Sequence, residues 1–196
     1  RMKKGIVLSV LAVLFPIMAF AYTNPGSPSG FVNDYAGMLS PQEKQQLEQK
    51  ISDFEKSTSN EISVVTVNDL GEDTIENFAV KLFEDWKIGK KGKDNGVLLL
   101  IAKSEQQMRI EVGYGLEGAL TDLQSNWIIQ NELKPNFQAG QFGAGISAGV
   151  DKIMSATRGE YVPSESDSRS GSSQGNFSWF DYWYFIPVAF TLLASI

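Results

Sequence analysis

The hydrophobic residues of the first third of the chain recur at helical spacing in two segments. Leu47, Ile51 and Phe54 mark one face of a helix, and residues 40–43 (SPQE) before them have the pattern of a capping box with proline at the first helical position. This pattern predicts a helix from residue 41 to about residue 57. A second helix is predicted to start at residues 73–76 and to end before Gly89, because apolar residues recur at positions 75, 79, 82 and 86.

Three further segments have the composition of strands. Residues 61–67 (EISVVTV) are β-branched and apolar, and residues 96–102 (GVLLLIA) form the unbroken apolar run of a strand that is covered on both faces. Residues 107–112 alternate apolar and polar positions, and the four-residue loop before them predicts a hairpin with strand 96–102. The helix between strands 61–67 and 96–102 predicts a right-handed βαβ unit, so these two strands should be parallel.

Two more helices are predicted near residues 122–133 and 137–157. The order of the elements therefore predicts an α/β fold, in which a mixed sheet of about four strands has helices on both faces.

This topology brings acidic and glycine-rich segments to one edge of the sheet. Asp94-Asn95-Gly96 opens one hairpin strand, Glu111-Val112-Gly113 closes its partner, and the loop 113–118 (GYGLEG) with Glu117 leads to a helix that begins at Asp122. Carboxylates held close together raise one another's pKa unless a cation compensates, and tight glycine turns can aim backbone carbonyls inward as Ca²⁺ ligands. The sequence therefore predicts a hard-metal site at this edge.

Each of these segments also fits a purely structural role. Residues 94–96 have the composition of a turn, Asp122 suits a helix N-terminus, and Glu111 suits a solvent-facing strand position. The glycines also match the spacing Gly-x-Gly-x-x-Gly of dinucleotide-binding loops, but no parallel strand follows to complete the βαβ unit that such a loop requires. The lysines at 87, 90, 91 and 93 read as a solvated loop, and they could also attract a phosphate toward a bound cation.

The composition excludes several kinds of chemistry. The 196 residues include no cysteine and no histidine, which excludes Ser-His-Asp and Cys-His catalysis, Cys/His zinc sites and disulfides. Any bound metal must therefore have oxygen ligands, which favours Ca²⁺, with Mg²⁺ or Mn²⁺ as possible substitutes.

The N-terminal sequence predicts export. Residues 1–21 combine a basic start at Lys3 and Lys4 with an apolar stretch and small residues at 19 and 21, as in a secretory signal peptide, although an uncleaved anchor or a buried helix would also fit. Cleavage after Ala21 removes Arg1, Lys3 and Lys4 and takes the net charge from −6 to −9. A chain this acidic should not bind nucleic acid.

The C-terminal sequence predicts a membrane tether. Residues 179–196 open with an aromatic cluster and continue without charge from Tyr182, but 15 residues cover only about 22 Å of a hydrocarbon core of about 30 Å. Part of a transmembrane helix, a shallow interfacial segment and a helix that docks on the domain all fit this length. The Ser- and Gly-rich residues 159–178 before it have the composition of a flexible linker.

Three ordered motifs resemble the TPM domain family. They are residues 31–40 (FVNDYAGMLS), 93–101 (KDNGVLLLI) and 109–122 (RIEVGYGLEGALTD), and the resemblance spans about residues 31–158. It implies an α/β/α sandwich that can bind calcium. By motif, the implicated positions are Asp94, Asn95, Glu111, Gly113, Tyr114, Leu116, Glu117 and Asp122, with Asp34 as a further candidate.

The resemblance and the residues together leave two classes of function open. The first is an accessory domain, tethered to the membrane outside the cytoplasm, that supports a membrane protein complex and whose bound Ca²⁺ orders loop 113–118. The second is a metal-dependent acid phosphatase, an activity proposed for plant members of the family. Without histidine, the chain offers no evident dedicated proton donor for this hydrolysis, which favours the accessory role.

Overall fold

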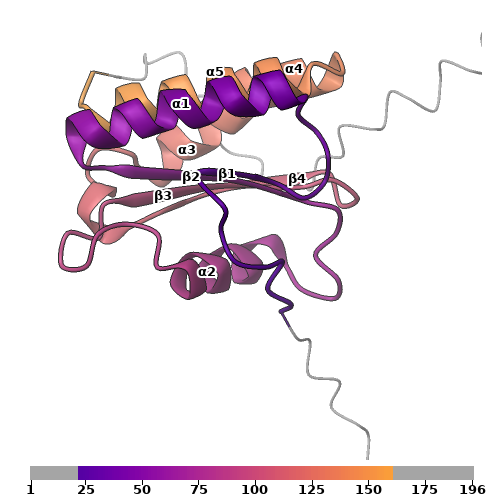
Figure 1. Ribbon diagram of the computed structural model, residues 1–196, viewed down its shortest axis with the longest axis horizontal. Coiled ribbons are helices and arrows are strands. Elements are labelled where there is room, and N and C mark those ends of the chain that lie inside the picture. The colour runs from indigo at the N-terminus through magenta and orange to yellow at the C-terminus, as the bar shows by residue number, and fades with distance from the viewer. Residues whose placement is uncertain (1–21, 161–196) are drawn as a thin grey trace, which may run out of the picture.

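Residues 22–160 of the computed structural model form a layered α/β domain (Figure 1). Its strands are β1 (Val32–Asp34), β2 (Glu61–Val67), β3 (Gly96–Ala102) and β4 (Gln107–Val112). Its α-helices are α1 (Pro41–Thr58), α2 (Ile75–Trp86), α3 (Asp122–Ile128), α4 (Lys134–Gln138) and α5 (Phe142–Thr157), and two short turns are η1 (Tyr114–Leu116) and η2 (Ile129–Leu133). This architecture confirms the predicted fold class.

The four strands form one mixed sheet in the order β1-β2-β3-β4. Strands β1, β2 and β3 are parallel, whereas β4 is antiparallel to β3, so the predicted βαβ unit and hairpin are both confirmed. Glu61 pairs with Gly96, and Val97 pairs with Val112. The starts of β2 and β3 and the end of β4 therefore lie at the same edge, which we call the Asn95 edge after the residue that joins its loops.

Strand β1 was not predicted, because a neighbouring helix rather than its own sequence pattern holds it in place. The Glu48 carboxylate on α1 accepts hydrogen bonds from the backbone N–H groups of Phe31 (2.8 Å) and Val32 (2.7 Å). The Phe31 carbonyl then accepts from Val64 N at 2.8 Å, which starts the pairing with β2.

The helices cover the sheet on both faces, with α2 on one side and α1, α3, α4 and α5 on the other (Figure 1). Because side chains alternate along a strand, β3 contributes Leu98 and Leu100 to the α2 side and Leu99 and Ile101 to the opposite side. All of β3 is buried, as its apolar run predicts. Both hydrophobic clusters consist of residues between 22 and 160, so this part of the chain has its own core.

The predicted break between the last helices is wrong in position. The helical path continues past residue 133 through the π-helical turn η2, in which Lys134 N donates to Ile129 O, and through α4. Pro135 is accommodated because it lies in the first turn of α4, where its missing N–H costs little. The chain turns instead at Gly140, whose φ of 72° suits glycine, and α5 starts at Phe142.

The predicted signal peptide, the linker beyond residue 160 and the C-terminal hydrophobic segment lie outside the described residues. Within residues 22–160, no helix has the length and apolar character needed to cross a membrane.

Candidate functional site

Two loops meet at the Asn95 edge. The first connects α2 to β3 and ends with Asp94 and Asn95, and the second follows β4 and contains the GYGLEG sequence. Gly113 N donates to Gly96 O at 2.8 Å, and Gly115 N donates to Asp94 O at 3.0 Å. The prediction that the topology brings these segments together therefore holds for their backbones.

Two of the glycines in this sequence are required by close backbone contact. A Cβ atom at Gly113 would lie 2.3 Å from Asp94 O, and one at Gly115 would lie 2.1 Å from Lys93 O. A Cβ atom at Gly118, in contrast, would meet nothing within 4 Å. The first two glycines thus let one loop lie directly on the other, and this packing explains them without a nucleotide.

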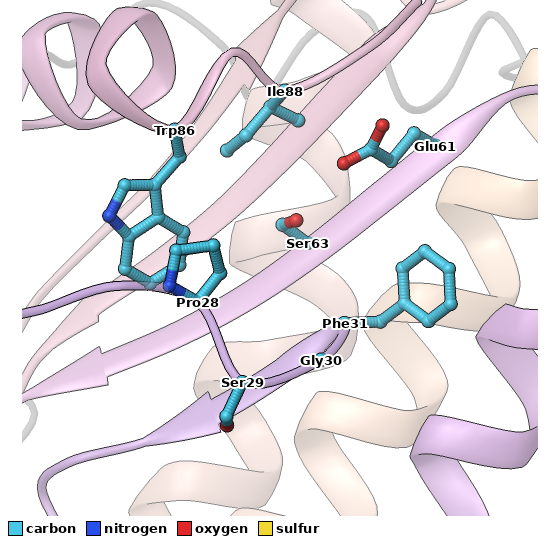
Figure 2. Close-up of a pocket in the computed structure, with 8 residues that line it drawn as sticks. All are labelled: Pro28, Ser29, Gly30, Phe31, Glu61, Ser63, Trp86 and Ile88. Carbon is cyan, nitrogen blue, oxygen red and sulfur yellow. The ribbon is translucent and has the colours of Figure 1, made fainter.

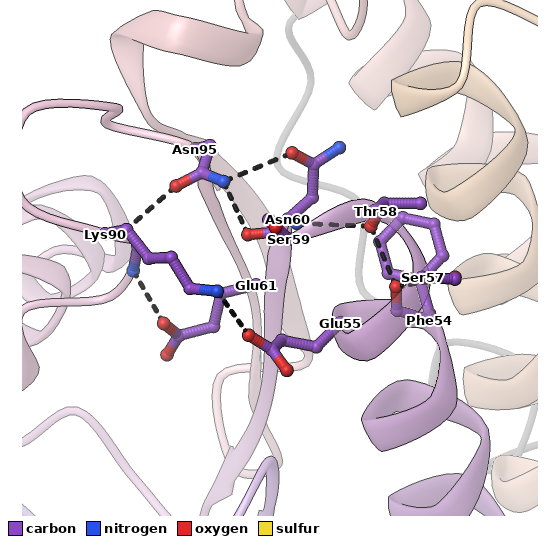
Figure 3. A network of polar contacts seen from close by, with 10 residues as sticks. Phe54, Glu55, Ser57, Thr58, Ser59, Asn60, Glu61, Lys90 and Asn95 are labelled. Carbon is purple, nitrogen blue, oxygen red and sulfur yellow. Dashed lines mark hydrogen bonds and ion pairs between the residues drawn. The ribbon is translucent and has the colours of Figure 1, made fainter.

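The Asn95 side chain fastens the first loop to the turn between α1 and β2 (Figure 3). Its Nδ2 donates to Ser59 O at 2.6 Å and to Asn60 Oδ1 at 3.3 Å, and its Oδ1 accepts from Lys90 N at 3.0 Å. The residue is only 6% exposed. Its amide is therefore committed to internal hydrogen bonds, which gives this predicted ligand a structural role.

Glutamate side chains hold the start of the same loop. Glu61 Oε2 accepts from Gly89 N at 3.1 Å, and Lys90 Nζ lies 2.6 Å from Glu55 Oε1 (Figure 3). One lysine of the basic run is thus paired with a carboxylate on α1, and it ties this loop to the layer on the opposite face of the sheet.

The remaining predicted residues differ in exposure, and Glu111 is half-buried. Gly113 and Leu116 are buried, and Glu111 Oε2 accepts from Arg109 Nε (3.1 Å) and Nη2 (2.9 Å) on the same strand. Four others are exposed: Asp94, Tyr114, Glu117 and Asp122. Asp94 has a φ of 48°, a left-handed conformation that Asp and Asn tolerate better than most residues.

The carboxylates at this edge do not form a tight cluster. Within residues 22–160, no three acidic side chains lie together in a way that could hold a metal ion. A cation at the Asn95 edge would therefore rely on backbone carbonyls, or on loop movement that brings the exposed carboxylates closer. The calcium site stays a prediction.

Asp34 lies away from these residues, at the carboxyl end of β1. Its Oδ1 accepts from Met38 N (2.9 Å) and from the Thr66 hydroxyl, and its Oδ2 accepts from Leu39 N (2.9 Å). These bonds organise the turn before α1, which explains an aspartate here without a ligand.

A family model for the TPM domain matches residues 32–156 of the chain. The chain belongs to the TPM domain family. The match includes all three motifs on which the resemblance rests, apart from Phe31 at its start. No curated protein matches the chain.

Solved structures of bacterial proteins share this fold. The N-terminal domain of a protein from P. gingivalis is 32% identical with a TM-score of 0.62, and the match covers 66% of this chain and 82% of that one. The BA42 protein from Bizionia argentinensis is 24% identical (TM-score 0.53, 66% and 88% covered). The N-terminal domain of the cg2496 protein from Corynebacterium glutamicum is 18% identical (TM-score 0.52, 74% and 93% covered). The last two likenesses show the fold alone.

Sequence reasoning placed Asn95 correctly in the TPM domain but missed what its side chain does. Its main partner, Ser59 O, is a backbone atom 36 positions earlier in the chain. No spacing in the sequence marks such a contact, because a backbone acceptor carries no residue signature.

Proposed function

We propose that this TPM domain is an accessory domain, tethered to the membrane outside the cytoplasm, that binds Ca²⁺ at the Asn95 edge and supports assembly, repair or regulation of a membrane complex. The observation that carries the proposal is the backbone contact between Asp94 and Gly113–Gly115. This contact holds two loops together and leaves their acidic side chains exposed.

The donors available at this edge are all oxygen atoms, as a hard cation requires. Asp94, Glu117 and Asp122 offer exposed carboxylates, and loop 113–118 adds backbone carbonyls. Glu111 keeps Oε1 free of the bonds that Arg109 makes to Oε2. A bound cation would supply the positive charge that lets these carboxylates lie close together.

The same edge presents an apolar surface that suits a protein partner. Tyr114 is 81% exposed in η1, and Leu123 is 47% exposed in the first turn of α3. Exposed aromatic residues are common anchors of interfaces, and rigid loops lose little entropy when a partner binds. A cation that fixes Glu117 and Asp122 would also fix the segment between these two apolar side chains.

A thermal melt of residues 22–160 tests the calcium site. The protein is stripped of metal and melted with Ca²⁺, Mg²⁺, Mn²⁺ or EDTA, alongside the variants Asp94→Asn and Glu72→Gln. Asparagine accepts the left-handed conformation at position 94, so the first variant removes only charge, and Glu72 is an exposed residue between β2 and α2.

Calcium at about 100 times its dissociation constant should stabilise the parent and the Glu72 variant by about 2.7 kcal/mol. Asp94→Asn should lose most of this gain. The absence of any response to cations in the parent would remove the calcium part of the proposal.

The same proteins test the alternative of an acid phosphatase. Turnover of p-nitrophenyl phosphate that needs a divalent cation and is lost in Asp94→Asn would favour the enzyme over the accessory role. Turnover that survives in Asp94→Asn would point to a contaminating enzyme.

The tether is tested in cells with the full chain. Carbonate extraction should leave the protein in the membrane fraction, and protease added outside the cytoplasmic membrane should degrade the domain. Release by carbonate, or protection from protease, would contradict the proposed location.

A further inference from the structure

A cavity of about 340 Å³ lies on the α2 side of the sheet, beside the start of β2. Its lining includes Pro28, Phe31, Glu61, Ser63, Trp86 and Ile88 (Figure 2). This volume falls at the small end of the range for small-molecule sites, which is about 300–1,000 Å³.

The cavity exists because α2 ends before it covers the whole of β2. Val65 and Val67 lie under α2 in the hydrophobic core, whereas Glu61 and Ser63 occupy the same side of the strand nearer its start. Figure 2 shows the Glu61 carboxylate and the Ser63 hydroxyl on the side of β2 that faces Trp86, at the end of α2, and Ile88. Polar residues thus replace valines where the helix no longer covers the strand.

Both polar groups retain capacity to bind a ligand. Ser63 is only 4% exposed, and its hydroxyl makes no hydrogen bond to another described residue. Glu61 uses Oε2 to accept from Gly89 N, which leaves Oε1 available. Among residues 22–160, no cationic nitrogen lies within 4.0 Å of the Glu61 carboxylate, because Lys90 Nζ is paired with Glu55.

Two features of the cavity itself favour a cation, whereas Lys87 and Lys90 lie beside it in the loop that follows α2. The C-terminus of α2, at Trp86, carries the negative end of the helix dipole, and the last turn of this helix contains no basic residue. Together with the Glu61 carboxylate, this makes one end of the cavity negative, whereas its walls are largely apolar.

The outer wall of the cavity is already fixed in place. The segment before β1, residues 22–30, is bound to the domain through Trp86 Nε1, which donates to Gly26 O at 2.9 Å. Tyr35 donates to Ser27 O at 3.3 Å, and Ser29 N donates to Asn33 Oδ1 at 2.8 Å. A ligand therefore enters a cavity whose shape does not have to form on binding, which reduces the entropy cost.

We infer that this cavity binds a primary ammonium group carried on an apolar stem, as at the end of a lysine side chain. The ammonium would donate to Glu61 Oε1 and to the Ser63 hydroxyl oxygen, and the stem would contact Trp86, Pro28 and Ile88. The cavity adjoins the Asn95 edge, since Glu61 N donates to Asn95 O at 3.0 Å, but none of the proposed calcium ligands lines it.

The test uses three probes of the same length on ¹⁵N-labelled residues 22–160. Pentylammonium and 1-pentanol carry a positive and a neutral head on a pentyl stem, and pentanoate carries a negative head on a butyl stem of the same total chain length. The Trp86 indole N–H reports on binding by NMR. The variants are Glu61→Gln, which keeps the acceptor for Gly89 N, Ser63→Ala, and Glu72→Gln as a charge control outside the cavity.

Pentylammonium should bind with a dissociation constant on the order of millimolar and should shift the Trp86 indole signal. 1-Pentanol should bind the parent, and pentylammonium should bind Glu61→Gln, about 10-fold or more weakly than pentylammonium binds the parent, since one of the two opposite charges is lost in each case. Pentanoate should not bind, Ser63→Ala should weaken binding less than Glu61→Gln, and Glu72→Gln should leave it unchanged.

Equal binding of all three probes, or unchanged binding of pentylammonium in Glu61→Gln, would overturn the assignment. A further probe, N-acetyl-lysine methylamide, separates the two sources of this chemistry. Binding at least as tight as that of pentylammonium assigns the cavity to a lysine side chain of a polypeptide, whereas weaker binding assigns it to a free amine.

Discussion

Replacing Gly115 by alanine tests whether the two loops of the Asn95 edge must lie in direct backbone contact. Gly115 does not have a positive φ, so its conformation is open to alanine, and the cost of the change comes from space alone. The new Cβ atom would lie 2.1 Å from Lys93 O and 3.2 Å from Asp94 O. Backbone atoms cannot move aside as the end of a flexible side chain can.

The size of the effect follows from these contacts. Ordinary contact begins at 3.4 Å, so the loops must separate by about 1 Å at this point, which also stretches the bond from Gly115 N to Asp94 O. Overpacking costs about 1–3 kcal/mol, and a lost backbone hydrogen bond costs about 1 kcal/mol more. We expect Gly115→Ala to lower the free energy of unfolding by about 2–4 kcal/mol.

Gly118→Ala is the matched control on the same loop. It has no atom within 4 Å of the new Cβ and no positive φ, so it should leave stability unchanged or raise it by about 0.4–1 kcal/mol through the unfolded state. Urea unfolding of residues 22–160 measures both changes. A Gly115→Ala protein within about 0.5 kcal/mol of the parent, or an equal loss in both variants, would refute the reasoning.

Three further changes test the surroundings of the site and the edges of the fold. Asn95→Ala removes the hydrogen bond to Ser59 O and leaves buried polar groups unpaired. Chemical denaturation should therefore show a free energy of unfolding that is lower by about 2–4 kcal/mol. A decrease below about 1 kcal/mol would show that this amide is dispensable. Glu48→Ala leaves the N–H groups of Phe31 and Val32, at the start of β1, without their acceptor. Hydrogen exchange at these two residues should accelerate at least 10-fold, and unchanged protection would contradict the role of Glu48. The Ser40 hydroxyl and N–H donate hydrogen bonds to the Glu43 carboxylate and hold its pKa below the ordinary value. The ionised carboxylate therefore stabilises the fold at a pH above its pKa in the unfolded chain, and this stabilisation is lost as the pH falls through its pKa in the folded protein. The stability difference between the parent and Glu43→Gln should therefore shrink from pH 7 to pH 3, and a difference that grows would show the opposite sign.

The elements that the sequence predicts well are those whose signals are local. The capping box at Ser40 and Glu43 forms with both of its hydrogen bonds, and the unbroken apolar run of β3 is buried on both faces. Loop 103–106 is short enough to force the hairpin between β3 and β4. In each case, the signal lies in residues that are close together in the sequence.

The elements that were missed depend on distant contacts. Strand β1 has three residues and needs the Glu48 carboxylate from α1, and the path through Pro135 needs a π-helical turn that no propensity scale marks. At the site, topology brought Asp94 to Gly113 correctly, because strand directions fix which loops meet. Topology could not show that the Asn95 amide donates to Ser59 O, since this hydrogen bond depends on the orientation of the side chain in three dimensions.

The measurement that tests the central claim most directly is a calcium titration of metal-stripped ¹⁵N-labelled residues 22–160 followed by NMR. Saturable shifts confined to residues 93–95 and 111–122 are expected, and Asp94→Asn should reduce them. Shifts that instead follow acidic residues elsewhere, or no shifts at millimolar Ca²⁺, would contradict a calcium site at the Asn95 edge.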